Sequence, residues 1–341
     1  MKIKLYHYKI PLSLPITSSA SYTREGLILF LQDKGGSYGI GEIAPLENLS
    51  RETIKDCIKQ VKAISGIIEK QNIEDISSRC YPSVRFGLEL AALSLEANKK
   101  EKSLFELLNK NNDFCEDKRV RLNALLTRQN IHELEKLLGL GYSSFKIKIR
   151  AEEDLKLVKQ ARYSGGWDIE IRLDANRSFS LDKGIRFGKK VYPLQIAYIE
   201  DPVTTGLKEF FDQTGIGIGI DQGIEFKEIR YGMHIKAWII KPGIVGGIRE
   251  SIALIKEALS LGILPVLSNP FYSGVGVSAL ICLSSAFIDK DIAMGFDPYR
   301  WIKEDILEEP LEIKEGSFFL KEVLKKMLKI NMKNLNLLFS N

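Results

Sequence analysis

Five charged residues stand at the ends of short apolar runs, and their spacing constrains the fold of this chain more than any other feature. They are two lysines and three carboxylates: Lys148, Asp174, Glu200, Asp221 and Lys241. Successive members are 26, 26, 21 and 20 residues apart, taken as differences between their numbers. Each interval is long enough for a loop, a helix, a second loop and a strand. The spacing therefore predicts successive βα units.

The apolar runs that end in these residues predict parallel strands. They span residues 145–148, 169–174, 196–200, 216–221 and 238–241. In a parallel α/β barrel the carboxyl ends of all strands open onto one mouth, and catalytic residues gather there. A single charge after a buried strand often marks only the return of the chain to solvent. Five charges in this order favour a shared site.

Length and composition fit a barrel with a smaller second domain. The 341 residues exceed the usual single-core size and accommodate a barrel of roughly 200 to 250 residues. Hydrophobic residues make up 45% and charged residues 27%, and no apolar stretch approaches the roughly 20 residues that span a bilayer. The N-terminus does not resemble a signal peptide, and the four cysteines lack paired spacing, so we expect a cytoplasmic protein.

The charge balance argues against nucleic-acid and membrane partners. The net charge is +5, and much of the excess lies in lysines between residues 321 and 333. Aromatic residues are not interleaved with these lysines, as a base-stacking surface would require. We expect a small-molecule carboxylate substrate, and the sequence leaves the oligomeric state open.

The pattern along the chain predicts an α/β fold in three parts. Residues 1–115 form an α+β capping domain, residues 116–305 a (β/α)7β barrel, and residues 306–341 a C-terminal segment that packs back on the capping domain. In the first part we expect strands near 2–10, 26–33 and 37–43, and helices near 51–70 and 83–98, the first capped by Ser50. The barrel would begin with a strand at 120–126 and end with strands at 264–268 and 292–296.

Three carboxylates on neighbouring strand ends predict a metal site. Asp174, Glu200 and Asp221 would direct anionic oxygens at one point, where they would repel one another without a cation. Mg2+ is the expected ion because it prefers octahedral oxygen coordination, and Mn2+ is the alternative. Such an ion, bound to a substrate carboxylate, stabilises the charge that develops when the neighbouring carbon loses its proton.

The lysines supply the base and a second cation for this chemistry. Lys146 and Lys148 alternate by two, so both point to the same face of their strand. The neighbouring Lys146 and the divalent ion should lower the pKa of Lys148 toward working pH, which suits a general base. Lys241 lies on the sixth strand, across the barrel from the second, and would stabilise the intermediate as a cation.

Several motifs together resemble the enolase superfamily over nearly the whole chain. They are Lys146-Ile147-Lys148, residues 172–177, Ile199-Glu200-Asp201-Pro202, Ile220-Asp221 and Ile240-Lys241-Pro242. Within the superfamily, they are most similar to the o-succinylbenzoate synthase family, as are residues 23–26, 41–46 and 82–87 of the capping domain.

The resemblance implies a capping domain on a modified TIM barrel, with Mg2+ on Asp174, Glu200 and Asp221. It implies syn-dehydration of 2-succinyl-6-hydroxy-2,4-cyclohexadiene-1-carboxylate to 2-succinylbenzoate in menaquinone biosynthesis. Lys148 would remove the alpha proton to give a metal-stabilised enediolate and then protonate the leaving hydroxide, while Lys241 would stack against the enediolate.

Substrate binding is expected to involve the loop that ends at Arg24 and the loop after the seventh strand. The candidate substrate-binding residues are Arg24, Asn176, Ser268, Asn269, Ser273 and Gly274. Backbone N–H groups at Gly274 and Gly276 could face a carboxylate. Gln222, where the family commonly has Glu, departs from the pattern, as does the Asn269-Pro270-Tyr272 loop.

Three alternatives remain open from the sequence. An N-acylamino acid racemase or dipeptide epimerase would use the same scaffold, but such epimerases usually carry Asp-x-Asp after strand eight, where this chain has one acid, Asp297. A Schiff-base aldolase would use Lys241 without a metal and leave three carboxylates unexplained. A non-catalytic binding module would not require both lysines and all three carboxylates.

Overall fold

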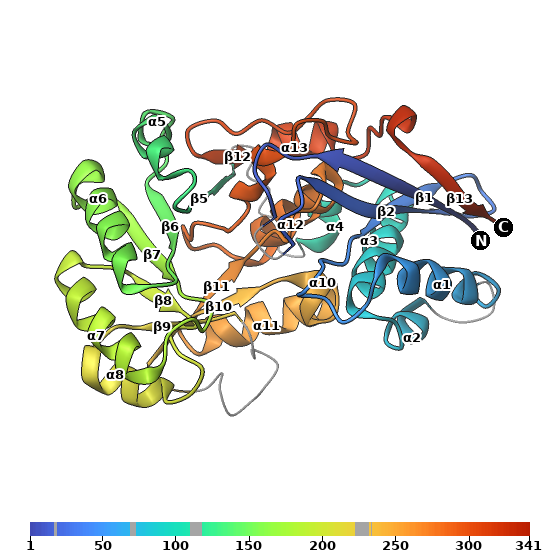
Figure 1. Ribbon diagram of the computed structural model, residues 1–341. Coiled ribbons are helices and arrows are strands. Elements are labelled where there is room, and N and C mark those ends of the chain that lie inside the picture. The colour runs from blue at the N-terminus through green and yellow to red at the C-terminus, as the bar shows by residue number, and fades with distance from the viewer. Residues whose placement is uncertain (17–18, 69–72, 110–117, 222–231, 233) are drawn as a thin grey trace.

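The computed structural model describes residues 1–16, 19–68, 73–109, 118–221, 232 and 234–341. A curled parallel sheet with helices outside it occupies one end of the molecule, and an α+β unit occupies the other (Figure 1). Both termini lie together on the α+β unit. This arrangement confirms the predicted fold class, a modified (β/α)7β barrel with a capping domain.

The capping domain is built on a four-stranded antiparallel sheet in the order β13-β1-β2-β3. The strands are β1 (Lys2–Pro11), β2 (Thr23–Gln32), β3 (Tyr38–Ile43) and β13 (Asn336–Ser340). The C-terminal segment therefore completes the capping sheet, as expected. The helices are α1 (Ile54–Ser65), α2 (Ile73–Ser77), α3 (Pro82–Lys99) and α4 (Leu104–Leu108).

Strand β3 and helix α3 approach each other closely because glycines line their contact. A Cβ added at Gly41 would lie 1.8 Å from the carbonyl oxygen of Gly87. A Cβ at Gly39 would lie 2.0 Å from the carbonyl oxygen of Ala91. Larger residues would push the helix off the strand. The contact fixes the position of Glu42, which follows Gly41 in β3.

Helix α1 begins later than the sequence pattern predicted. Its N-cap is Thr53, whose side chain accepts from the Asp56 N–H while the Asp56 carboxylate accepts from the Thr53 N–H. The prediction that Ser50 caps this helix was wrong. The Ser50 hydroxyl instead accepts from the Leu46 N–H at 2.9 Å, so it stabilises the preceding turn.

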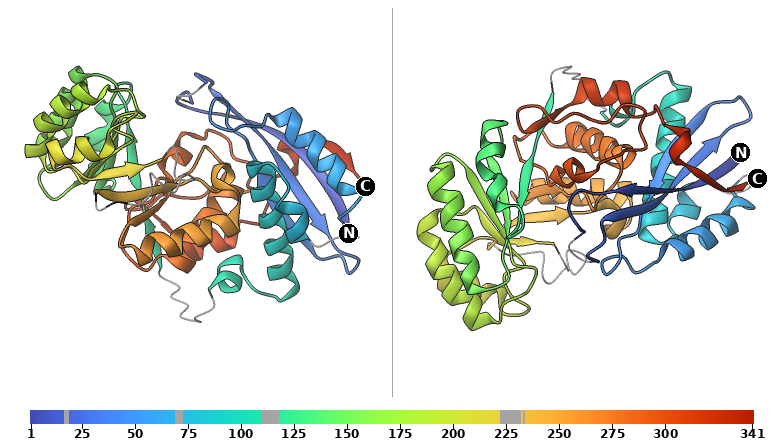
Figure 2. Two further views of the ribbon diagram at one scale, coloured as in Figure 1. Left: turned by 90° about the horizontal axis from the view of Figure 1, so that it is seen from below. Right: turned by 45° about the horizontal axis from the view of Figure 1, so that its top comes forward.

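The barrel domain carries a seven-stranded parallel sheet in the order β11-β10-β9-β8-β7-β6-β5. Its strands are β5 (Asn123–Leu126), β6 (Ser144–Lys148), β7 (Glu170–Asp174), β8 (Tyr198–Glu200), β9 (Ile218–Ile220), β10 (Ile235–Ile240) and β11 (Leu264–Leu267). The helices that cover it are α5 (Leu134–Gly139), α6 (Leu155–Gly165), α7 (Leu181–Val191), α8 (Leu207–Thr214), α10 (Pro242–Val245), α11 (Ile248–Ser260) and α12 (Gly274–Phe287). A small sheet of β4 (Arg119–Arg121) and β12 (Ser317–Phe319) precedes helix α13 (Leu320–Lys326). Figure 2 shows α6, α7 and α8 gathered on the outside of the green and yellow strands.

Residues 294–295 connect the two edges of this sheet. Met294 bridges to Leu122, and Gly295 bridges to Ser268. The Asn123 N–H donates to the carbonyl of Met294, and the Gly295 N–H donates to the carbonyl of Leu267, each at 2.9 Å. The predicted eighth strand at 292–296 is thus reduced to two isolated bridges.

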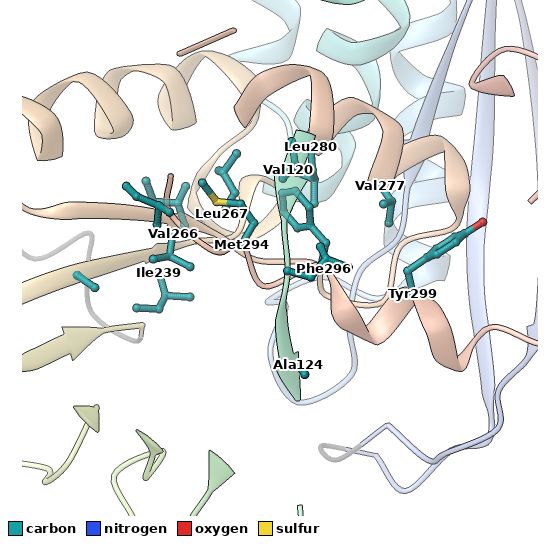
Figure 3. Packing of buried hydrophobic residues seen from close by; sticks show 14 of the residues in the cluster. Val120, Ala124, Ile239, Val266, Leu267, Val277, Leu280, Met294, Phe296 and Tyr299 are labelled. Atoms are coloured by element: carbon teal, nitrogen blue, oxygen red, sulfur yellow. The ribbon is translucent and has the colours of Figure 1, made fainter. Parts of the chain in front are cut away.

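An apolar core fills the space between the sheet and α12. Ile239 of β10, Val266 and Leu267 of β11, and Val277 and Leu280 of α12 belong to this core, which Figure 3 shows from close by. Helix α12 is almost entirely buried, because it lies between the barrel and the capping domain. No helix in the described part of the chain is long and apolar enough to span a membrane.

The expected domain boundary near residue 115 and the family departure at Gln222 lie outside the described residues.

Candidate active site

Strand register brings the predicted site residues to one mouth. Lys148 on β6 pairs with Asp174 on β7, which pairs with Glu200 on β8, so these three residues form a row across adjacent strands. Glu200 pairs with Gly219 on β9, two residues before Asp221. Lys241 follows the last residue of β10. All five residues therefore lie at the carboxyl end of the sheet.

Lys146 holds two of the carboxylates. Its Nζ donates to Glu200 Oε2 at 3.0 Å and lies 3.6 Å from Asp174 Oδ2. Burial disfavours the charged form of Lys146, but the Glu200 and Asp174 carboxylates outweigh it and raise its pKa. Glu200 is 1% exposed, and burial raises its pKa to about 7 against the attraction of Lys146. Burial also acts against ionised Asp174, but Lys146 and Lys148 lower its pKa overall.

Lys148 differs from Lys146 in its electrostatic surroundings. Its Nζ lies 3.8 Å from Asp174 Oδ2, and its side chain is 22% exposed. Burial lowers its pKa, and the positive charges of Lys146 and Lys241 lower it further against the pull of Asp174. A lysine with a lowered pKa is a better proton acceptor near neutral pH.

Lys241 is held by Asp221. Its Nζ donates to both carboxylate oxygens, at 2.6 Å to Oδ1. Lys148 lies on β6 and Lys241 follows the end of β10. Strands β7, β8 and β9 lie between them in the sheet. A substrate at this mouth would have a lysine on each side.

The three carboxylates are the residues that would hold a divalent cation. Within the described residues, no three acidic, histidine or cysteine side chains stand close enough together to hold a metal ion. In this structure the ammonium groups of Lys146 and Lys241 pair with the Glu200 and Asp221 carboxylates. The donor set nevertheless fits Mg2+. All three side chains offer hard oxygen ligands, and Glu200 is a buried carboxylate whose raised pKa records the cost of its charge. The chemistry of these ligands favours a cation at this place.

A cavity of about 180 Å3 lies at the mouth, between the barrel and the capping domain. Its charged and polar lining includes Lys146, Lys148, Arg150, Asp174, Asn176, Asp221, Lys241, Ser268 and Asn269. Leu46, Asn48 and Leu49 contribute from the loop after β3. The capping domain thus forms part of the site wall.

Asn176, Ser268 and Asn269, all predicted to bind substrate, line this cavity. Asn269 is 3% exposed, and its Oδ1 accepts from the Tyr272 N–H at 2.6 Å. That bond fixes the amide orientation. Its Nδ2 has no hydrogen-bond partner among the described residues, so the cavity wall carries an unused buried donor.

Arg24, also predicted to bind substrate, does not line this cavity. Its guanidinium donates to the carbonyl oxygens of Ala44, of Pro45 at 2.7 Å and of Phe271 at 3.0 Å. The side chain is 4% exposed. Arg24 therefore ties the capping domain to the loop after β11.

Ser273 and Gly274 do not line the cavity either, because carboxylates of the chain itself occupy the N-terminus of α12. Glu42 accepts from the Ser273 N–H at 2.9 Å, the Ser273 hydroxyl at 2.7 Å and the Gly276 N–H at 2.7 Å. Asp305 accepts from the Gly274 N–H at 3.0 Å. The chain's own carboxylates thus accept from the Gly274 and Gly276 N–H groups that we expected to face a substrate carboxylate, and in this structure the groups are not open to a substrate.

Sequence reasoning missed some cavity residues. Asn123 and Leu125 line the cavity from β5, and Asn48 and Leu49 line it from the capping domain. The strand alternation of β5 could have identified the first two. Arg150 also lines the cavity. It follows Lys148 by two residues, so the alternation of side chains that places Lys146 and Lys148 on one face could have identified it.

Comparison with known families gives two matches. Residues 130–323 match the model described as enolase C-terminal domain-like. Residues 1–95 match the model described as MenC, N-terminal domain. Together they cover both the barrel and the capping domain.

Curated relatives are similar over most of the chain. It is 30% identical to the o-succinylbenzoate synthase of Yersinia enterocolitica, over 82% of this chain and 85% of that protein. It is 27% identical to the chloroplastic protein PHYLLO of Arabidopsis thaliana over 86% of this chain, and the match spans only 20% of PHYLLO.

Solved structures share the fold. The dipeptide epimerase from Cytophaga hutchinsonii, complexed with Mg and the dipeptide D-Ala-L-Val, superimposes with a TM-score of 0.80 and 18% identity. The match covers 93% of this chain and 92% of that protein.

Proposed function

The chain belongs to the enolase superfamily, and from that premise we propose that it is an o-succinylbenzoate synthase of menaquinone biosynthesis. The reaction is the syn-dehydration of 2-succinyl-6-hydroxy-2,4-cyclohexadiene-1-carboxylate to 2-succinylbenzoate. Superfamily membership and the names of the relatives support an enzyme of the lyase or isomerase type. The capping-domain match and the o-succinylbenzoate synthase relatives favour the hydro-lyase.

The row formed by Lys148, Asp174 and Glu200 carries this proposal. It sets a lysine with a lowered pKa beside Asp174 on the neighbouring strand, and Asp174 in turn stands beside Glu200 on the next strand. In the proposed reaction, Lys148 Nζ takes the proton from the carbon next to the ring carboxylate. The same ammonium group then returns that proton to the departing hydroxide on the same face. One residue suffices as both base and acid because the ring becomes aromatic.

Lys241 would offset negative charge from the other side of the cavity as the alpha proton leaves. Its ion pair with Asp221 holds the ammonium at the cavity wall. Asp174, Glu200 and Asp221 would hold Mg2+, which when bound stabilises the negative charge that develops on the substrate carboxylate. Mn2+ would serve the same purpose.

An epimerase or racemase is the second candidate, because Lys148 and Lys241 face one cavity from two sides. The surroundings of Asp297 disfavour its dipeptide form. Asp297 is fully buried and accepts from the Leu125 N–H, the Tyr142 hydroxyl and the Arg300 guanidinium. It is therefore not available to a substrate amine, and the same region offers no second acid at residue 295 or 299.

The proposal is tested by following ultraviolet absorbance as purified protein consumes the cyclohexadiene substrate with Mg2+, with and without chelator. Turnover that stops on chelation would support the synthase. If the diene persists with Mg2+ present, the synthase proposal is overturned. Deuterium uptake at the alpha carbon across a panel of dipeptides and N-acylamino acids would then identify an epimerase or racemase.

A further inference from the structure

A third cation continues the row of lysines on β6. Ile149 extends the ladder beyond the strand, since its N–H donates to the carbonyl of Asp174 at 2.9 Å. Ile149 is buried and Arg150 is exposed. Because side chains alternate along extended backbone, Lys146, Lys148 and Arg150 share a face, and all three line the cavity. Exposure increases along this row from the barrel interior to its mouth.

Arg150 also lines a second cavity of about 300 Å3. This cavity lies between Pro15, Ile16 and Ala20 of the capping domain and the turn after β5, and Lys148 is the other residue common to both cavities. Sites for small molecules commonly offer about 300 to 1,000 Å3. The volume of the first cavity alone is below that range. The two cavities share Lys148 and Arg150, and their combined volume lies within the range.

The carboxylate beside the second cavity does not neutralise the positive charge of Arg150. Arg128 is neutralised by Asp154, whose Oδ1 lies 2.5 Å from Arg128 Nε. Asp154 Oδ2 accepts from the backbone N–H groups of Arg150 and Ala151. In the described part of the chain, the Arg150 guanidinium forms no hydrogen bond or ion pair. It is a planar two-point donor for a carboxylate.

Building on the function proposed above, we propose that Arg150 binds the distal carboxylate of the substrate and that the second cavity holds the succinyl side chain. The spacing fits this assignment. Two residues of extended backbone span about 6.7 Å. Five carbon–carbon bonds separate the alpha carbon from the distal carboxyl carbon, which is roughly 6 Å in an extended chain. When the alpha carbon of the substrate lies at Lys148, its distal carboxylate therefore reaches the Arg150 guanidinium.

The test compares Arg150→Gln and Arg150→Lys with Arg186→Gln, which removes an exposed guanidinium on the outer helix α7. We expect Arg150→Gln to raise KM for the cyclohexadiene substrate about 10- to 100-fold while kcat changes less than about 2-fold. Arg150→Lys should recover part of this loss because it retains the charge. Arg186→Gln should match the unaltered protein.

A binding measurement separates this proposal from the synthase assignment. Calorimetry with Mg2+ should show that the unaltered protein binds 2-succinylbenzoate at least about 10-fold tighter than its distal methyl ester. Arg150→Gln should bind both equally. An unaltered protein that does not prefer the acid, or an Arg150→Gln variant that keeps the preference, would overturn the subsite. If the unaltered protein does not turn over the cyclohexadiene substrate, the synthase function is overturned instead. The comparison of 2-succinylbenzoate with its methyl ester in calorimetry then still decides whether the subsite exists.

Discussion

Lys148 differs from Lys146 in the direction of its pKa shift, because the pKa of Lys148 is lowered and that of Lys146 is raised. Lys148 Nζ lies 3.8 Å from Asp174 Oδ2, and Lys146 and Lys241 each donate to a carboxylate oxygen within 3.0 Å. A lowered pKa suits Lys148 to the proton transfer that we propose for it.

The first prediction concerns Lys148→Ala. The variant should lose at least about 10^3-fold in kcat, because a positioned general base contributes about 10^2- to 10^4-fold and here also returns the proton. Turnover would be measured by the ultraviolet assay and folding by circular dichroism. Lys159→Ala, an exposed position on α6, serves as the control. Substantial residual activity in a folded Lys148→Ala protein would rule out this lysine as the base.

The lowered pKa of Lys148 predicts a pH dependence. Only the uncharged amine accepts a proton, so kcat/KM should rise with pH, with a midpoint below the ordinary lysine value of about 10.4. Lys241→Gln removes a cation that lowers this pKa, so the midpoint of its residual activity should move to higher pH. Lys156→Gln, exposed on α6, should leave it unchanged. A midpoint that stays or falls in Lys241→Gln would contradict this account of Lys148.

Asp221→Asn tests the metal site without relying on turnover. Replacing one of three anionic ligands by a neutral amide should weaken Mg2+ binding at least about 10-fold, as measured by calorimetry. Asp212→Asn, on the outer helix α8, loses the same charge away from the mouth and should bind Mg2+ normally. Equal affinities in the two variants would remove Asp221 from the proposed ligand set.

At the scale of elements, long periodic segments could be predicted and short ones could not. The prediction of a helix near 83–98 is confirmed by α3 (Pro82–Lys99). Helices α8 and α10 were not predicted, because eight and four residues hold too few turns for an apolar period to emerge. The ends of β6 to β10 were predictable because a charged residue closes the apolar run of each. The strand register then gathered the lysines and carboxylates.

The loop after β11 shows what the sequence could not reveal. Its N–H groups were predictable as carboxylate donors, but their partners are not local. Glu42 is 231 residues from Ser273, and Asp305 is 31 residues from Gly274. Likewise, nothing near Arg24 in the sequence indicates that Phe271 accepts from it, 247 residues away. Long-range pairing therefore decided which candidate residues line the cavity.

Glu42 links the two domains through helix α12, and its removal should be costly. Glu42→Ala would leave the Ser273 and Gly276 N–H groups and two hydroxyls without their acceptor at a buried helix start. We expect a loss of about 2–4 kcal/mol in the free energy of unfolding, as measured by denaturant titration. Glu47→Ala, exposed on the following loop, should cost less than about 0.5 kcal/mol. Similar losses in both variants would argue against the interdomain cap.

For the whole molecule, β1 contributes to two apolar cores. Ile3 and Leu5 pack in the core that includes Cys57 and Val61 of α1. Tyr8 and Ile10 belong to the large core that continues through the barrel. One strand thus joins the capping helices to the barrel, which favours unfolding of the two domains together.

Strand β13 covers the outer edge of β1, so its removal should affect stability and association more than catalysis. A chain truncated after Leu335 would lose the pairing of β13 with β1 and the bond from the Ile3 N–H to Asn341 Oδ1. The side chains of β13 are mostly exposed, so the loss is mainly backbone hydrogen bonding, about 1–3 kcal/mol. We expect a Tm lower by several degrees and, because β1 becomes an open edge, concentration-dependent association in size-exclusion chromatography.

The control for this truncation is Leu338→Ser, which alters a 39% exposed side chain of β13 and retains the backbone. Its Tm and its elution profile should match those of the full chain. kcat and KM should remain within about 2-fold in both variants, because the cavity is lined by barrel residues and by the loop after β3, not by β1 or β13. A large fall in kcat on truncation would mean that the edge of the capping sheet controls the geometry of the mouth, 95 or more residues of sequence away from Lys241.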